Sequence, residues 1–183
     1  MGVKLCGYGV DMVPVASHHL ELLRQWRNSN FVRQQMVSND HISGEQQLRW
    51  FDNICLRNDQ VHFVIQYKGE AIGSANLKAL CGNSVEQANR LEPGIYIGDE
   101  RYHSNILAFA PSLLLLDYCF DDLGVKQLFA KVKINNQAAL NYNHKLGYRE
   151  VDKDGEYVFI TLDYERYLAS TVTLKKLFSR QAK

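Results

Sequence analysis

Residues 123–148 read LGVKQLFAKVKINNQAALNYNHKLGY, and this segment predicts a strand, a turn and a short helix. Over 127–134 every second residue is apolar (Leu128, Ala130, Val132 and Ile134), and this period of two is typical of a half-buried strand. Asn135 and Asn136 follow, and asparagine side chains accept hydrogen bonds from the free amide groups at the start of a helix. The helix has an apolar face with a spacing of four, and Gly147 can adopt the left-handed conformation that ends a helix.

The composition is that of an ordinary globular protein. The 183 residues are 46% hydrophobic and 22% charged, with a formal net charge of +1. We therefore expect one domain over 1–183, with a helical tail over 163–183 and no binding of nucleic acid by charge alone. The four cysteines lack the spacing of a metal site or redox motif, and the chain shows neither a signal peptide nor a membrane-spanning apolar run. These features predict a cytoplasmic protein with reduced thiols, no metal and no membrane association.

The remaining elements alternate between helices and strands, without an internal repeat. Capping residues, periodicity and glycine turns mark their ends. Together they predict an α+β domain with one central, mostly antiparallel mixed sheet and helices on both faces. We expect a strand over 7–15, a helix capped by Ser17, a short helix over 31–36, a helix over 44–57, a hairpin of strands 61–67 and 71–80, a loop over 81–93, a strand over 94–98, an apolar helix over 106–123, and a hairpin of 148–151 with 157–162 about Asp154 and Gly155.

The order of strand 94–98, loop, apolar helix, strand 127–134 and helix 136–146 resembles the second half of the GCN5-related N-acetyltransferase (GNAT) family. Members of this family transfer an acetyl group from acetyl-CoA to an amine. The resemblance implies a GNAT-like fold in which the two strands run parallel, splay apart and hold the pantetheine arm of acetyl-CoA between them. The backbone of the first strand would then bind the pantetheine amides as an added strand would.

The loop DERYHSNI (99–106) stands where the family binds the cofactor pyrophosphate, beside a helix N-terminus that favours anions. The family pattern there is Arg or Gln, two residues, Gly, one residue, and Gly or Ala. Arg101 fits it, whereas Ser104 and Ile106 stand at the glycine positions. The alternatives are a cradle shifted by one or two residues, a domain that binds CoA weakly or not at all, and a surface loop leading into a core helix. The resemblance implies as cofactor-binding residues Ile95, Tyr96, Ile97, Arg101, His103, Ser104, Asn105, Ile106, Asn136 and Asn143.

Acetylation of an amine needs a base that accepts a proton, and an acid can protonate the leaving thiolate. Related sequences often carry glutamate where Glu92 stands, which makes it a candidate base, with Glu100 and His103 as the others nearby. Glu92 could instead cap a loop. The family's proton donor is a tyrosine seven residues after the capping asparagine, a position that Asn143 holds here. Tyr142 precedes it, and is either a proton donor or a core residue.

The segments LLRQWRNSNFVRQQM (22–36) and ISGEQQLRWF (42–51) resemble RimJ/RimL-type acetyltransferases. They resemble still more the amino-sugar-nucleotide acetyltransferases of pseudaminic acid and related bacterial surface-sugar pathways. This likeness implies direct transfer in a ternary complex to a 4-amino-deoxysugar attached to a nucleotide. Protein N-terminal or side-chain acetylation and a non-catalytic GNAT-like binding module are the alternatives. Edge strands in this family often support homodimers, so a homodimer is also considered.

The same segments supply the candidate substrate-binding residues. Trp26 and Trp50 could stack on a sugar or uracil ring, and Arg27 and Arg33 could hold a diphosphate through forked hydrogen bonds. Met36 could line a pocket. The alternative for both tryptophans and for Met36 is a place in the core, and for the arginines a place in solvent.

Overall fold

The computed structural model describes residues 3–80, 84–103 and 105–181. Within them the strands form one eight-stranded sheet of order β1-β2-β3-β4-β5-β6-β8-β7. Neighbouring strands are antiparallel except β5 and β6, so the expected α+β class with a mostly antiparallel mixed sheet is confirmed. The strands are β1 (Leu5–Gly7), β2 (Val10–Pro14), β3 (Gln60–Tyr67), β4 (Glu70–Ala79), β5 (Arg90–Ile97), β6 (Gln127–Lys133), β7 (Arg149–Asp154) and β8 (Tyr157–Leu162).

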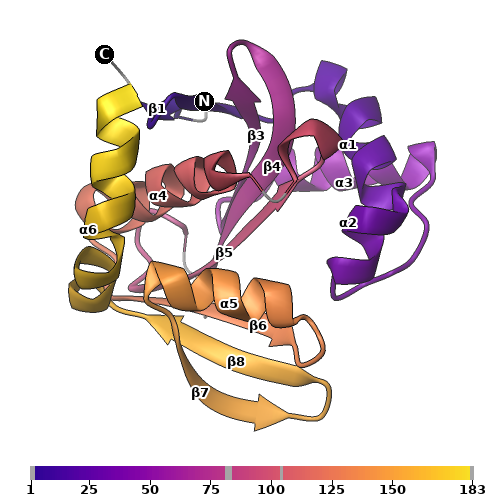
Figure 1. Cartoon of the computed structure of the whole chain (residues 1–183). Helices are drawn as coiled ribbons and strands as arrows, with labels where there is room; N and C mark the ends of the chain where they lie inside the picture. Colours follow the sequence, from indigo (N-terminus) through magenta and orange to yellow (C-terminus); the bar gives the residue numbers. More distant parts are fainter. Residues whose placement is uncertain (1–2, 81–83, 104, 182–183) are drawn as a thin grey trace.

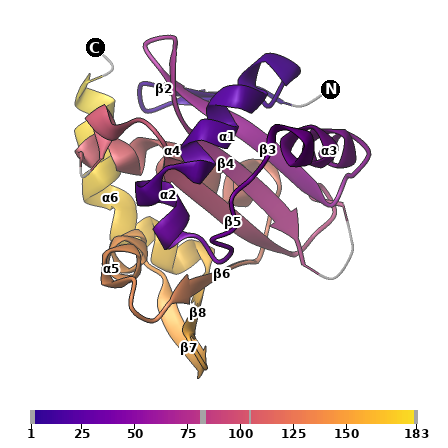
Figure 2. The same ribbon diagram turned by 90° about the vertical axis from the view of Figure 1, so that its right-hand side faces the viewer.

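Helices cover both faces of the sheet, as expected. Three of them lie in front of β3, β4 and β5 on the side that we call the front face (Figure 2): α1 (Leu20–Asn28), α2 (Asn30–Gln35) and α3 (Gly44–Cys55). The others lie on the opposite side, the back face (Figure 1): α4 (Phe109–Asp117), α5 (Gln137–Leu146) and α6 (Tyr164–Gln181).

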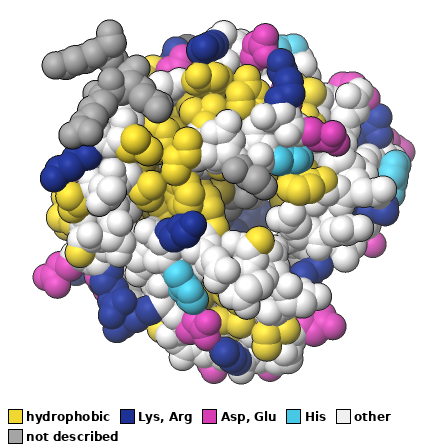
Figure 3. Space-filling view, viewed as in Figure 1, with side chains coloured by type: hydrophobic (Ala, Val, Ile, Leu, Met, Phe, Trp, Pro, Cys, Tyr) yellow, Lys and Arg dark blue, Asp and Glu magenta, His cyan; other side chains and the backbone are white. Residues whose placement is uncertain are grey.

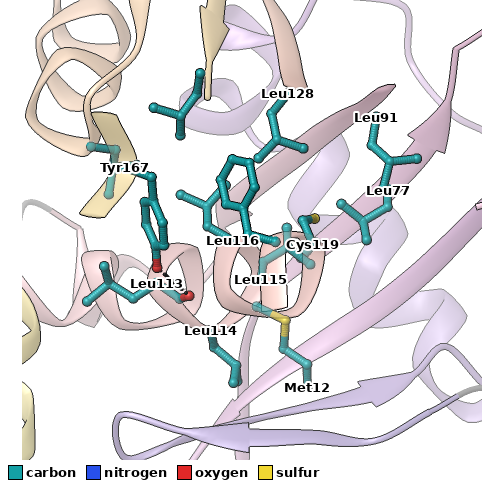
Figure 4. Packing of buried hydrophobic residues seen from close by; sticks show 14 of the residues in the cluster. Met12, Leu77, Leu91, Leu113, Leu114, Leu115, Leu116, Cys119, Leu128 and Tyr167 are labelled. Atoms are coloured by element: carbon teal, nitrogen blue, oxygen red, sulfur yellow. Dashed lines mark hydrogen bonds between the residues drawn. The ribbon is translucent and has the colours of Figure 1, made fainter. Parts of the chain in front are cut away.

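The main core lies on the back face around α4. This helix is apolar on all sides, and its residues Leu113, Leu114, Leu115 and Leu116 are all buried. Figure 4 shows these leucines among side chains from both halves of the sheet, Met12, Leu77, Leu91 and Leu128. Helix α4 therefore holds together strands on either side of the parallel pair.

Two expectations near the N-terminus are wrong. The single strand predicted over 7–15 is a hairpin of β1 and β2, because Tyr8 and Gly9 adopt positive φ angles of 54° and 78°, as a two-residue hairpin turn requires. Ser17 is not a helix cap but the first residue of a 3-10 turn. The His19 ring accepts the amide of Ala16 there, at 3.0 Å from Nδ1.

The boundaries around β5 also differ from the prediction. This strand begins at Arg90, so the loop predicted over 81–93 is too long and the strand predicted over 94–98 is too short; residues 81–83 lie outside the described residues. Strand β5 pairs with β4 along its whole length, and this long-range partner extends it past the polar residues that suggested a loop.

The helix expected over 106–123 consists of three segments: a 3-10 turn (Ile106–Ala108), α4, and a π-helical segment (Tyr118–Asp122). Pro111 lies in the first turn of α4, where its missing amide removes no helical hydrogen bond. The last hairpin turns at Gly155 and Glu156, one residue later than expected.

The capping predictions for α3 and α5 are confirmed. The amide of Gln46 donates to Ser43 Oγ at 3.2 Å, and the amide of Ser43 donates to Gln46 Oε1 at 2.7 Å. Asn136 Oδ1 accepts the amide of Ala139 at 3.0 Å, and Gly147 ends α5 with a φ angle of 100°. Local sequence therefore determines both ends of α5.

Cys6, Cys55 and Cys119 are free thiols, and Cys81 lies outside the described residues. None of the helices described between residues 3 and 181 is long and apolar enough to cross a membrane. The same part of the chain holds no group of three His, Cys, Asp or Glu side chains placed to bind a metal ion.

Candidate active site

The parallel strands β5 and β6 form a wedge. They pair only at Arg90 with Gln127 and at Leu91 with Leu128, although β5 continues to Ile97 and β6 to Lys133. Figure 1 shows the two parts of the sheet diverging from this point. Beyond it the facing backbone edges have no partner strand, so an extended ligand can pair with them. The expected splay of the parallel pair is confirmed.

Glu92 lies at the apex of the wedge. It is the first β5 residue beyond the last pair with β6, and it is half-buried. Its cross-strand neighbour in β4 is Lys78, which is exposed. Because side chains alternate between the faces and Leu91 points into the back-face core, Glu92 lies on the front face. This carboxylate therefore stands beside the point where the two strands part.

Gly94 and Tyr96 continue the front face of β5, and Gly98 follows directly after the strand; Ile95 and Ile97 between them pack against the back-face core. A Cβ atom on Gly98 would lie 2.1 Å from Cδ2 of Trp26, so the indole of α1 occupies the space of the missing side chain. A Cβ atom on Gly94 would lie 2.5 Å from Oδ1 of Asn76. The two glycines thus let α1 and the Asn76 amide approach the backbone on the front face closely.

Asn76 was not among the residues predicted from the sequence. The sequence feature that points to Asn76 is a pair of polar residues, Ser74 and Asn76, in the middle of the otherwise apolar strand segment IGSANL. In a central strand covered by helices on both faces, polar side chains need hydrogen-bond partners or a ligand. Ser74 has its partner, because its hydroxyl donates to the carbonyl oxygen of Phe63 at 2.9 Å.

Arg27 brings a positive charge to the same region. Burial raises the pKa of Tyr96 to about 12, and the charge of Arg27 and the Ser74 hydroxyl act in the opposite direction. Nη1 of Arg27 is buried and has no hydrogen-bond partner among the described residues. A buried nitrogen of a guanidinium without an acceptor costs free energy, which a bound anion can offset. The structure thus places Trp26 and Arg27 beside the end of β5, near Gly98 and Tyr96, whereas Glu92 lies near its start, roughly 13 Å from Tyr96 along the strand.

The other predicted substrate residues lie elsewhere. The indole of Trp50 packs edge-on against His62 of β3, with ring centres 5.1 Å apart and planes at 86°. This contact places Trp50 in the packing of α3 onto the sheet. Arg33 and Met36 are half-buried residues at the end of α2.

His103 connects α2 to the end of β5. Its ring stacks on Phe31 with centres 3.7 Å apart and planes at 16°, and its Nε2 lies 3.1 Å from the carbonyl oxygen of Ile97. The ring face and one nitrogen are therefore already occupied. A catalytic role for His103 would need the other nitrogen.

The predicted phosphate loop leads into α4 through short 3-10 turns. Arg101 pairs with Asp99 at 2.7 Å and with Glu70 at 2.8 Å, with 63% of its side chain exposed, so a phosphate would compete with two carboxylates for it. Asn105 Oδ1 accepts the amide of Leu107 at 3.0 Å. Ile106 is exposed and adopts no positive φ angle, so the isoleucine at a family glycine position is not strained. Ser104 lies outside the described residues.

Helix α5 contributes the remaining candidates. Asn136 caps the helix, and Nδ2 of Asn143 donates to the carbonyl oxygen of Ala139 at 2.8 Å. The Tyr142 hydroxyl donates to the carbonyl oxygen of Ala108 at 2.8 Å and lies 2.6 Å from Oγ of Ser112. Burial raises the pKa of Tyr142 well above its usual value. Figure 3 shows the surface hollowed near the centre of this view, between α4 and α5.

Comparison with known proteins agrees with this geometry. Residues 10–149 match the family described as acetyltransferase (GNAT) domain. The chain belongs to the GNAT family. It is an N-acetyltransferase that uses acetyl-CoA as donor, and the unpaired edges of β5 and β6 suit the extended arm of that donor.

GNAT proteins that are named for different acceptors resemble this chain. The mouse alpha/beta-tubulin-N-acetyltransferase 9 is 22% identical over an alignment of 170 residues, and the alignment covers 86% of this chain and 69% of that protein. The apo structure of FdhC, described as a nucleotide-linked sugar GNAT, is 18% identical with a TM-score of 0.77, covering 94% of this chain and 97% of that one. The aminoglycoside acetyltransferase AAC(6')-Ib in complex with coenzyme A is 15% identical with a TM-score of 0.73, covering 87% and 98%. These structural likenesses show the fold and leave the acceptor open.

Proposed function

We propose that this enzyme acetylates the amino group of a nucleotide-linked 4-amino-deoxysugar by direct transfer in a ternary complex. The observation that carries the proposal is the wedge with Glu92 at its apex, together with the indole of Trp26 and the buried nitrogen of Arg27, unpaired among the described residues, on the same front face towards the end of β5. An acceptor that lies along the front face of β5 meets a flat apolar surface and a positive charge towards the end of the strand, and a carboxylate at the apex. The likeness to FdhC supports this acceptor class.

Each group has a distinct role in the proposed reaction. Glu92 accepts a proton from the acceptor ammonium, directly or through water, so that the neutral amine attacks the thioester carbonyl. Arg27 adds a positive charge to the face along which an anionic acceptor approaches. The strand edges from Glu92 to Ile97 fix the pantetheine amides and so position the thioester. The predicted phosphate contacts of 101–106 and the α5 contacts of Asn136 and Asn143 belong to the same proposal.

Protein acetylation is the second candidate, and the likeness to the tubulin acetyltransferase favours it. Arg27 favours an acceptor that carries an anionic group, which the diphosphate of a nucleotide sugar supplies and a peptide N-terminus by itself does not. The remaining alternative is a non-catalytic binding module. The open wedge, which suits the acetyl donor, and the match to the acetyltransferase family both favour an enzyme instead.

The test is an acetylation assay that follows thiol release and product mass. Acetyl-CoA is supplied with UDP-linked and TDP-linked 4-amino-4,6-dideoxysugars, with the corresponding free amino sugars, and with peptides bearing free N-termini. We expect turnover with a nucleotide-linked amine and at least about tenfold lower kcat/KM with the free sugar, because the free sugar lacks the anion. Turnover confined to peptides would establish the second candidate instead.

Tyr142 can be tested separately as proton donor. We expect Tyr142→Phe to keep kcat within about threefold, because the thiolate of CoA is a good leaving group and the phenol proton is already donated to Ala108. We also expect the variant to lose about 1–3 kcal/mol of unfolding free energy, since Ser112 and the Ala108 carbonyl lose a buried partner. A fall in kcat of a hundredfold with normal stability would establish Tyr142 as the acid.

A further inference from the structure

Beside the wedge, the front face carries five aromatic and basic side chains that the proposed reaction leaves unused. We call them the basic aromatic strip: Arg90 of β5, Phe129 and Lys131 of β6, and Tyr157 and Phe159 of β8. Lys131 pairs across the strands with Phe159, so their side chains share one face. Their alternate neighbours Leu128, Val132, Val158 and Ile160 are buried in the back-face core.

The strip begins where the wedge opens. Phe129 is the first β6 residue beyond the last pair with β5, as Glu92 is in β5. Arg90 precedes Glu92 by two residues, so both lie on the front face about 7 Å apart along the strand. The Cζ atom of Arg90 lies 5.8 Å from the centre of the Phe129 ring. The guanidinium, the ring and the carboxylate therefore surround the apex.

The rings and the cations of the strip alternate in space. Phe129 and Phe159 are stacked, with centres 5.8 Å apart and planes at 27°. Nζ of Lys131 lies 3.7 Å from the centre of the Tyr157 ring and 5.8 Å from that of Phe159. All three rings are half-buried, and Arg90 and Lys131 are exposed. Neither cation forms an ion pair within the described part of the chain, so both are free to bind an anion.

We propose that the basic aromatic strip binds the nucleoside diphosphate of the acceptor, an inference that rests on the proposed function. The base stacks on Phe129 or Phe159, and Arg90 and Lys131 pair with the phosphates. Because Arg90 and Glu92 are neighbours on one strand face, a phosphate on Arg90 leaves room for one sugar ring between it and an amine at Glu92. The strip would thus set the distance between the anion and the reacting amine.

Charge favours a nucleotide over a second copy of this chain. A twofold contact centred on the strip would place Arg90 and Lys131 against their own copies, and like charges at close range repel. A polycationic acceptor meets the same repulsion. A nucleoside diphosphate matches both components, because its base is flat and its phosphates are negative.

The binding test uses UDP as probe, titrated calorimetrically into the protein saturated with CoA, so that the cofactor site is already filled. We expect Phe129→Leu and Lys131→Gln each to weaken UDP binding about tenfold, and Lys131→Arg to restore most of it. Lys153→Gln is the matched control: Lys153 is an exposed β7 lysine whose cross-strand neighbour, Val158, lies in the back-face core. This control should bind UDP like the unchanged protein.

Acetylation of the UDP-linked sugar is then measured for the same variants. A raised KM for the sugar with an unchanged KM for acetyl-CoA supports the strip. The strip proposal would be overturned if the unchanged protein did not bind UDP, or if all variants bound UDP equally. It would also be overturned if the strip variants dissociated a dimer without changing UDP binding. Turnover of a nucleotide-linked sugar with normal KM in the strip variants would overturn the strip while leaving the proposed function intact. Failure of the unchanged enzyme to acetylate any such sugar would instead refute the proposed function.

Discussion

Replacing Glu92 by glutamine is expected to lower kcat by about 10²–10³, while the affinity for acetyl-CoA changes less than about twofold. Glutamine keeps the size and polarity of the side chain but cannot accept a proton from the acceptor ammonium. The effect should therefore appear in the chemical step. Kinetic measurement of kcat and both KM values, with calorimetry for acetyl-CoA, separates the two contributions.

Glu100→Gln is the matched control, because Glu100 is the other candidate glutamate but lies exposed in the 3-10 turn after β5. We expect its kcat to stay within about twofold of the unchanged enzyme. If Glu100→Gln lost activity and Glu92→Gln kept it, the base would lie in the loop and Glu92 would have a structural role. If both variants lost activity equally, the net charge of the region would matter rather than either carboxylate in particular.

Replacing Asp117 by alanine is expected to lower the unfolding free energy by about 2–4 kcal/mol. This carboxylate at the end of α4 accepts the hydroxyl groups of Tyr8 and Tyr167, each at 2.5 Å, and pairs with Lys175 at 2.6 Å. It therefore joins the first hairpin, α4 and α6. Burial first, and the neighbouring carboxylate second, raise the pKa of both phenols well above the usual value, which keeps them protonated as donors.

Urea unfolding at pH 7 measures this loss, and a melting scan should show a midpoint lower by about 5–15 °C. Asp121→Ala is the control, because Asp121 accepts one hydrogen bond, from the exposed Tyr164, at 2.8 Å. We expect the control to lose less than about 1 kcal/mol. Equal losses in the two variants would contradict the role of Asp117 as a junction.

Long-range pairing explains the misplaced boundaries. Strand β5 begins at Arg90 because β4 offers it partners from Ala79 onward, although RLEP reads locally as a loop. The hairpin turn at Tyr8 and Gly9, by contrast, has a local signal in the sequence, namely the glycine. Boundaries set by distant partners do not appear in local periodicity.

The sequence alone determined the turn and helix from Asn136 to Gly147, the capping box at Ser43, and the family resemblance. The turn, the helix and the capping box depend on residues within four positions of one another, and such neighbours interact however the rest of the chain folds. The resemblance depends on the order of the elements along the chain, which the sequence also contains. Only the tertiary structure placed Glu92 and Phe129 at the apex of one wedge and Trp26 beside the far end of β5, because they belong to segments that are distant in sequence. Their meeting depends on where β5 and β6 stop pairing while α4 binds both halves of the sheet.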